Sequence, residues 1–465
     1  MTDAAHNQSL ERLDLERVFH PVASIADVSK NGPMVMARAS GATVTDHHGK
    51  AYIDCGAGLW CANIGYGRPE MAEAAKKAIS ELSYYHMFAG ASNEHAVRLA
   101  DCLIRSFQND TPAKRLARVF YGQSGSDAND TNIKLVRLYN NLLGRPEKKK
   151  ILARNGGYHG LTVASASLTG IPAYHKAFDL PGSDVVHLTC PHYFHFHEDG
   201  EDEAAFTDRL LTELEAVISE HGAETIAAFI AEPVMGTGGV FTPPKGYFEG
   251  VQKVLKRYGI LFIADEVITG FGRLGAWSGT VTYDLDPDIV TLAKGITSAY
   301  FPLSASVVSE DMWSVFEAAS DEMGAIMHGF TYSGHPVGCA LAMTNLDILE
   351  SEGMIENASA RGAQLLQRLR EETADHPYVG DVRGEGFMIG VEFVADRETR
   401  RPFPVGTGPH KRVAAACKEA GLLSRALPYL DVMAFSPPLC MTEYEVDEAA
   451  VRFKRGLDAA ALEAA

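Results

Sequence analysis

The feature that most constrains the fold is a series of short apolar runs separated by amphipathic stretches. In these runs apolar residues follow one another without alternating with polar ones, which is typical of strands buried on both faces. The runs cover residues 119–121, 151–154, 185–188, 226–231, 260–264, 289–293 and 303–308. Helical patterns such as 128–143 and 206–221 lie between some of them, each followed by glycine. We therefore expect an α/β protein with a predominantly parallel sheet.

The length of the chain predicts more than one core. Domain cores stop growing at roughly 250–300 residues, and this chain has 465. Near the N-terminus, strand-like pieces at 42–45 and 51–54 flank a turn at 46–49. Beyond residue 336 the patterns predict short strands near 379–382 and 388–393 and helices at 337–351, 356–376 and 411–420. We predict a large domain over residues 71–335 and a smaller α+β domain built from residues 1–70 and 336–465.

Charge and cysteine usage exclude several classes of protein. Asp and Glu total 60 against 42 Lys and Arg, a formal charge of −18, which disfavours a nucleic-acid or anionic-membrane surface. The seven cysteines lack CxxC spacing, and the histidines at 187, 192, 195 and 197 match no familiar zinc pattern, so we expect no metal site. No apolar stretch reaches the ~20 residues that a membrane span needs. These features predict a cytoplasmic protein with reduced thiols.

Three segments that follow apolar runs carry potential chemistry. The first, Gly-Gln-Ser-Gly-Ser-Asp at 122–127, leads from a predicted strand into a helix. A glycine-containing turn at a helix N-terminus offers free N–H groups and a positive dipole end, which suits a phosphate. The alternative is an ordinary helix capped by serine. The segment lacks the ending of a Walker A loop.

The other two segments end in charged side chains. Asp265 and Glu266 follow the run 260–264, and Lys294 follows the run 289–293. A carboxylate at the end of a buried strand needs a cationic or polar partner, and a buried lysine has a lowered pKa that makes it a nucleophilic amine. Taken singly, the carboxylates would favour a structural ion pair over a functional acid, and the alternative for the lysine is a side chain that reaches solvent. Together with a phosphate seat, they match what pyridoxal 5'-phosphate requires.

Several motifs resemble those of class III (omega) pyridoxal-phosphate-dependent aminotransferases. They occur in the family's order over nearly the whole chain. The motifs are SGSDAND at 124–130, GYHG at 157–160, AEPVMGTGG at 231–239, ADEVITGFGR at 264–273, LAKGITSAY at 292–300 and HGFTYSGHPVGCA at 328–340. GLW at 58–60, YYHMF at 84–88 and Arg425 resemble the omega-amine:pyruvate branch. The resemblance implies fold type I, with a mostly parallel seven-stranded sheet in the large domain.

The resemblance also implies roles for the cofactor-binding residues. Lys294 would form the Schiff base with the cofactor and then move the proton during catalysis. Asp265 would keep the pyridine nitrogen protonated. Gly125 and Ser126 would bind the phosphate, and Thr331 would reach the same phosphate from a neighbouring subunit. The last role implies a homodimer with shared active sites, with a tetramer left open.

Other residues would surround the cofactor ring and the substrate. Tyr158 would stack on one face of the ring, Val267 would pack on the other, and Glu232 would lie in the polar shell. Asp127 stands where the family often has Glu, a change that keeps the charge.

The resemblance places Leu59, Trp60 and Phe88 in an apolar substrate pocket. Without it, aromatic residues would be assigned to the core. Arg425 would pair with the carboxylate of the keto acid, because arginine suits bidentate carboxylate binding. The alternative for Arg425 is an exposed position at the rim.

The leading hypothesis is a transaminase that moves an amino group from an omega-amino acid or primary amine to pyruvate in a ping-pong reaction. An aminomutase, which needs no external keto acid, is the alternative. A non-catalytic binding protein has no need to bury Lys294 and Asp265, and a nicotinamide dehydrogenase would carry GxGxxG after its first strand. The sequence leaves taurine, β-alanine and polyamines open as donors, because pocket shape discriminates among them by only ~1–3 kcal/mol.

Overall fold

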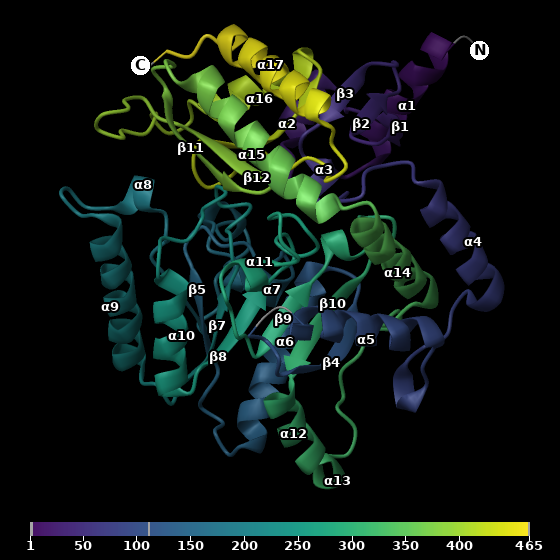
Figure 1. The fold of residues 1–465 in the computed structure, drawn as a ribbon, viewed down its shortest axis with the longest axis vertical. Coiled ribbons are helices and arrows are strands. Elements are labelled where there is room, and N and C mark those ends of the chain that lie inside the picture. The colour runs from purple at the N-terminus through teal and green to yellow at the C-terminus, as the bar shows by residue number, and fades with distance from the viewer. Residues whose placement is uncertain (1–2, 110–111, 464–465) are drawn as a thin grey trace.

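A seven-stranded sheet forms the centre of the large domain in a computed structural model that describes residues 3–109 and 112–463 (Figure 1). Its strand order is β4-β10-β9-β8-β7-β5-β6. The strands are β4 (Leu116–Gly122), β5 (Lys150–Arg154), β6 (Val185–Leu188), β7 (Ile226–Ala231), β8 (Leu261–Asp265), β9 (Ile289–Leu292) and β10 (Ser304–Ser309). All seven predicted strands are present, with ends that differ by a few residues at most.

Strand β10 is the antiparallel member of this sheet. It pairs antiparallel with both β4 and β9, whereas the neighbours from β9 to β6 pair parallel. Parallel neighbours require a long crossover, while antiparallel neighbours are joined by a short connection. Residues 293–303 are such a connection, and they bring β10 back between β9 and β4. The carboxyl ends of the six other strands therefore share one edge of the sheet.

Apolar layers cover both faces of the sheet, which explains the continuous apolar runs. Every residue of β7 is buried, and neighbouring residues of this strand belong to different core clusters, Phe229 to one and Ile230 to another. Helix α6 (Gly125–Leu142) packs on β4, β7, β9 and β10. On other parts of the sheet lie α5 (Glu94–Asn109), α10 (Tyr247–Tyr258) and α12 (Glu310–Ala318), and α9 (Glu203–His221) packs against α10.

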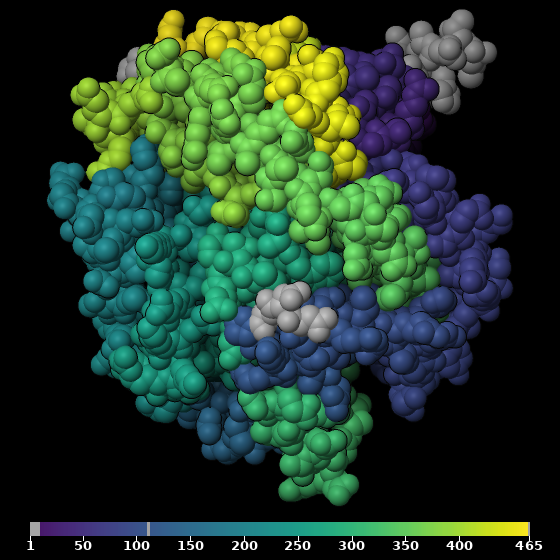
Figure 2. Space-filling model, viewed as in Figure 1, coloured from purple at the N-terminus to yellow at the C-terminus, as the bar shows by residue number. Residues whose placement is uncertain are grey.

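Two four-stranded sheets form the smaller part of the molecule. The first has the order β1-β2-β3-β13, with β1 (Met36–Ser40), β2 (Thr43–Asp46), β3 (Ala51–Asp54) and β13 (Leu422–Leu423). The second has the order β11-β12-β15-β14, with β11 (Val379–Glu385), β12 (Met388–Phe393), β15 (Val432–Phe435) and β14 (Arg425–Ala426). Because β13 pairs parallel with β3, both ends of the chain contribute to one sheet, and Figure 2 shows the N-terminal and C-terminal segments together at the top of the molecule.

Helices α15 (Met354–Thr373), α16 (Pro409–Glu419) and α17 (Glu443–Ala459) pack with these two sheets. Helix α14 (Pro336–Ser351) packs against α4 (Pro69–Leu82) and α5, beside the large sheet. The shorter helices are α2 (Ile25–Asn31), α3 (Ala57–Trp60), α7 (Val163–Leu168), α8 (Tyr193–Phe196), α11 (Gly279–Thr282) and α13 (Ser320–Met323). The polar leader contains a helix that the apolar pattern did not predict, α1 (Asp3–Arg17). Among the described helices, none is long and apolar enough to cross a bilayer.

Candidate active site

A cavity of about 380 Å³ opens at the edge where the carboxyl ends of the large sheet's strands meet. Its wall brings together most of the site residues predicted from the sequence, although they come from distant parts of the chain. These residues are Leu59, Gly125, Ser126, Tyr158, Glu232, Asp265, Val267, Lys294 and Arg425. The convergence follows from the sheet, because the loops after parallel strands all emerge at one edge.

The N-terminus of α6 forms one end of this cavity. Ser124 caps the helix by accepting a hydrogen bond from the Asp127 N–H at 3.2 Å, and the Asp127 carboxylate accepts one from the Ser124 N–H, which is a capping box. The first N–H groups of a helix have no intrahelical partner, and those of Gly125 and Ser126 make no hydrogen bond within the described chain. They are available to an anion in the cavity. A Cβ at Gly125 would lie 2.9 Å from Val267 Cγ2, so glycine lets the helix approach that side chain.

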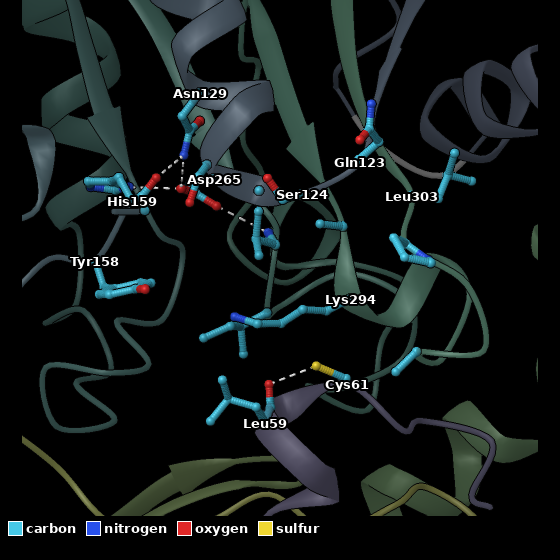
Figure 3. Close-up of a pocket in the computed structure, with 18 of the residues that line it drawn as sticks. Leu59, Cys61, Gln123, Ser124, Asn129, Tyr158, His159, Asp265, Lys294 and Leu303 are labelled. Atoms are coloured by element: carbon cyan, nitrogen blue, oxygen red, sulfur yellow. Dashed lines mark hydrogen bonds and ion pairs between the residues drawn. The ribbon is translucent and has the colours of Figure 1, made fainter. Parts of the chain in front are cut away.

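Asp265 follows the buried strand β8 and is itself buried. Its Oδ2 accepts hydrogen bonds from Asn129 Nδ2 and His159 Nδ1, each at 2.8 Å, and its Oδ1 accepts one from the Val267 N–H at 3.2 Å. Figure 3 shows this network on one side of Lys294. Three donors therefore satisfy the carboxyl oxygens at this depth. They fix the orientation of Asp265 in the cavity wall.

Lys294 lies just after β9, in the wall of the same cavity. Its backbone has φ +45°, a left-handed conformation that costs a non-glycine residue of order 1–3 kcal/mol and is common at functional sites. Burial lowers the pKa of the Lys294 amine, while Cys61 and Asp265 act in the opposite direction. Within the described residues its Nζ has no hydrogen bond or ion pair. Figure 3 shows it between the Asp265 network and the side chains of Leu59 and Cys61. This amine is free to react.

Glu232 follows β7 and holds two loops of the cavity in place. Its Oε1 accepts a hydrogen bond from the Tyr158 N–H and its Oε2 accepts one from the Gly236 N–H, both at 2.9 Å. Burial raises the pKa of its carboxyl group. Tyr158, positioned in this way, makes an edge contact with Tyr174. The carboxylate thus orients an aromatic ring that faces the cavity.

Arg425 enters the cavity from the small domain, on strand β14. It is half-buried, and burial lowers the pKa of its guanidinium while Tyr174 and Tyr158 act in the opposite direction. No carboxylate of the described residues forms an ion pair with it. An unpaired guanidinium in a cavity is suited to binding a carboxylate from a ligand.

Three predicted site residues lie away from this cavity wall. Trp60 is 1% exposed and packs in an apolar cluster with Val234 and Leu274. Phe88 is 48% exposed, in a short 3-10 helix, and its ring lies next to Gly329. Thr331 is also exposed, and its carbonyl accepts a hydrogen bond from Tyr84 Oη at 2.8 Å. Within one chain, these three residues do not line the cavity that the other site residues share.

The cavity also contains residues for which the sequence indicated no role. Asn129 and His159, which hold Asp265, lie inside the motifs SGSDAND and GYHG. Cys61 lies beside Leu59, whose carbonyl accepts from its thiol at 2.9 Å. The position of these two polar residues inside the motifs is the signal by which the sequence could have identified Asn129 and His159. No pattern indicated Cys61.

Comparison with known proteins establishes the family. Residues 24–457 match the family model described as aminotransferase class-III. The chain belongs to the class III aminotransferase family. It is 44% identical over 457 residues to a diaminobutyrate–2-oxoglutarate transaminase from Halomonas elongata, with 97% of this chain and 96% of that protein covered. A mitochondrial gamma-aminobutyrate transaminase 1 from Oryza sativa subsp. indica is 46% identical over 419 residues, covering 90% of this chain and 79% of the relative.

Solved structures agree with this assignment. An omega transaminase from Pseudomonas jessenii in complex with PMP has a TM-score of 0.93 and 42% identity, with 97% of this chain and 98% of that chain covered. A thermostable (S)-enantioselective omega-transaminase from Thermomicrobium roseum also has a TM-score of 0.93, at 41% identity, covering 98% of this chain and 99% of that chain. The expected fold type I, with its seven-stranded sheet, is confirmed.

Class III aminotransferases use pyridoxal 5'-phosphate, and the cavity fits this cofactor. It combines a helix N-terminus with free N–H groups, a buried carboxylate and a lysine without a partner, which are the three groups that the cofactor's phosphate, ring nitrogen and aldehyde need. The protein is thus a transaminase, an enzyme that exchanges an amino group between an amine and a keto acid.

Proposed function

We propose that Lys294 and Asp265 are the catalytic residues of this transaminase. Lys294 would bind the cofactor's aldehyde carbon and, once freed by the substrate amine, would carry the proton between substrate and cofactor. When bound, the cofactor withdraws electrons from the substrate carbon that loses this proton. Asp265 would keep the ring nitrogen protonated, and its hydrogen bonds to Asn129 and His159 support this role because they hold the carboxyl group in a fixed position in the cavity wall.

The phosphate and the ring would be held by the residues around the α6 N-terminus. Gly125 and Ser126 would donate their N–H groups to the phosphate. Tyr158 would stack on one face of the ring and Val267 would pack on the other, and their shared position on the cavity wall supports this arrangement. Glu232 would act from the polar shell, where it positions the Tyr158 loop.

We propose a homodimer with shared active sites as the minimal active unit, with a tetramer left open. Thr331 would reach the phosphate of the neighbouring subunit. Its exposure in one chain supports this role, and Phe88, next to Gly329, lies on the same exposed surface. Phe88 would therefore reach the neighbour's substrate pocket from that surface, while Leu59 and Trp60 would contribute to the pocket from their own subunit.

The amino donor we propose is an omega-amino acid or a primary amine, and the acceptor is pyruvate. The donors named in diaminobutyrate and gamma-aminobutyrate transaminases are omega-amino acids, which supports the donor class. The observation that carries the acceptor is the unpaired Arg425. Among the described residues lining the cavity it is the one arginine, and the one other cationic side chain is Lys294. A single free guanidinium matches a keto acid with one carboxylate, such as pyruvate, better than the two carboxylates of 2-oxoglutarate.

The test is the visible absorbance of the cofactor through both half-reactions. We expect the band of the holoenzyme to bleach with an omega-amine and to return with pyruvate faster than with 2-oxoglutarate. If the band returns with 2-oxoglutarate but not with pyruvate, the acceptor assignment is wrong. An aminomutase, the alternative reading, would instead convert its amine to an isomer without any added keto acid.

We further propose that residues 71–335 form the large domain and residues 1–70 with 336–465 the small one, and that the enzyme works in the cytoplasm without nucleic-acid or membrane partners. The net charge of −18 supports the last point.

A further inference from the structure

His328 anchors the segment that carries Thr331 to its own chain. Residues 324–335 connect α13 to α14 and contain no helix or strand. Met327 is 89% exposed and Tyr332 is 54% exposed, whereas His328 is partly buried. The imidazole is thus directed toward the body of its own chain.

Both ring nitrogens of His328 bond to helix α6. Nδ1 lies 2.8 Å from Nζ of Lys134, and Nε2 lies 2.9 Å from Oγ1 of Thr131. The Thr131 hydroxyl donates its proton to the Asp127 carbonyl at 2.8 Å, so it accepts from His328. Because an ammonium group only donates, Nδ1 accepts and the proton of the neutral ring is on Nε2. Burial and the nearby Lys134 lower the pKa of His328, which favours this neutral form.

Aromatic contacts fix the plane of the same ring. His328 stacks on Phe120 of β4, with ring centroids 5.1 Å apart and planes 9° apart. Phe330 makes edge contacts with both rings, with centroids 5.2 Å from His328 and 6.1 Å from Phe120. Two hydrogen bonds and an aromatic cluster therefore determine where the chain lies three residues before Thr331.

The end of α6 that faces the cavity is held independently of His328. The Asp127 carboxylate accepts hydrogen bonds from the backbone N–H groups of Gln123 and Ser124 and from Ser304 Oγ. His328 also does not line the cavity of its own chain. Loss of its side chain should therefore loosen residues 324–335 and leave the α6 N-terminus in place.

Two other hydrogen bonds hold the segment at later positions. Tyr84 Oη donates to the Thr331 carbonyl and Asn93 Nδ2 donates to the Gly334 carbonyl, each at 2.8 Å. Tyr84 is itself 38% exposed. Of these hydrogen bonds, those of His328 are the ones that join the segment to α6.

We propose that His328 is a positioning residue for the active site of the neighbouring subunit. It holds residues 324–335 so that Thr331 meets the phosphate of the cofactor bound by the other chain. This inference rests on the shared active site proposed above and deepens it, because the contact of His328 with α6 in one subunit then sets the cofactor affinity of the other.

The experiment uses full-length mixed dimers, purified through two different tags, in which one chain carries Lys294→Ala. The other chain alone then binds the cofactor through Lys294, so the cofactor absorbance reports a single site. The cofactor is removed and pyridoxal 5'-phosphate is titrated back. With His328→Phe on the Lys294→Ala chain, we expect affinity at the working site to fall on the order of tenfold, as for a lost hydrogen bond to a charged group. With His328→Phe on the chain that keeps Lys294, affinity should be unchanged.

Further variants separate positioning from a general structural defect. His328→Gln should retain most of the affinity, because its amide can accept from Lys134 and donate to Thr131. Lys134→Met, at an exposed position, should fold normally and lose part of the affinity. His376→Phe, which replaces a partly buried histidine just after α15, is the matched control and should change nothing. Pyridoxal, which lacks the phosphate, should bind equally to all of these proteins.

Weaker binding in both arrangements, in the reverse arrangement only or in neither would overturn the proposal, as would an equal loss for pyridoxal. Thr331→Ala in the same two arrangements tests the shared site itself. If Thr331→Ala weakens binding at the other chain's site while His328→Phe does not, the positioning role is wrong and the shared site stands. If Thr331→Ala acts only within its own chain, or if no mixed dimer forms, the shared site is wrong and the positioning role falls with it.

Discussion

Nδ1 of His159 lies 2.8 Å from Oδ2 of Asp265, and both side chains are buried. Because a carboxylate accepts and does not donate, the proton of this contact is on Nδ1. The imidazole, together with Asn129, fixes the direction in which the carboxylate faces the cavity. The ring of His159 is thus a positioning group for the residue that we assign to the cofactor's nitrogen.

Removing this positioning group should slow catalysis. In His159→Leu we expect kcat to fall on the order of 10- to 100-fold, because a hydrogen bond to a charged group is worth about 1.5–3 kcal/mol. His159→Gln, which keeps a side-chain N–H, should retain more activity. His187→Leu is the control, since His187 bonds the Leu168 carbonyl, away from the cavity. Steady-state kinetics and the pH dependence of the cofactor absorbance would be measured. Equal losses at positions 159 and 187 would refute the positioning role.

Arg425 should matter for the acceptor more than for the donor. In Arg425→Ala we expect the KM for pyruvate to rise by about 10- to 100-fold, the loss of one charge-assisted hydrogen-bonded pair. The KM for a primary amine without a carboxylate should change little. Arg401→Ala, at an exposed position of the small domain, is the control. Parallel loss for both substrates would remove the carboxylate-binding role.

Shared active sites predict complementation between inactive chains. If Thr331 serves the neighbouring subunit, a dimer that combines one Lys294→Ala chain with one Thr331→Ala chain has one site with both residues intact. At a cofactor concentration that leaves each variant alone inactive, the mixed and reassembled chains should recover activity. Activity would be assayed before and after reassembly, with the chains mixed but not dissociated as the control. No recovery, despite mass-spectrometric detection of mixed dimers, would contradict the shared site.

His192 should make stability depend on pH. This residue is buried against Glu392, and burial, with Arg383 nearby, lowers its pKa from 6.5 to about 4. Between these values the unfolded chain binds a proton that the folded chain does not, so the free energy of unfolding falls as pH drops through this window. In His192→Gln the fall should be smaller, as measured by the midpoint of thermal unfolding across the window. His195→Gln, at a partly exposed position, is the control. An unchanged pH profile in His192→Gln would contradict this.

The sequence predicted the large sheet well because its strands are buried on both faces and therefore read as unbroken apolar runs. It also predicted the residues at the strand ends, such as Asp265 and Lys294, since polar residues there are conspicuous. The edge strands β13 and β14 are only two residues long, which is too short to show any alternation of apolar and polar residues. The antiparallel direction of β10 depends on which strands become neighbours, which a run of apolar residues does not specify.

Other parts of the site depend on tertiary contacts. Nothing local in the sequence brings His159 to Asp265, 106 residues away. The motif around Trp60 predicts a pocket residue, yet Trp60 lies in an apolar cluster. The backbone before it is non-helical at Gly58 and Leu59, which the sequence did not indicate. Its substrate role stays a prediction.

The most direct test of the central claim is to locate the lysine that holds the cofactor. The holoenzyme would be reduced with borohydride, digested, and mapped by mass spectrometry, with Lys294→Ala treated in parallel. We predict that the reduced cofactor is attached to the peptide containing Lys294, and that the variant lacks the label and loses turnover by about a thousandfold or more. Attachment to another lysine, or substantial turnover in Lys294→Ala, would contradict the account.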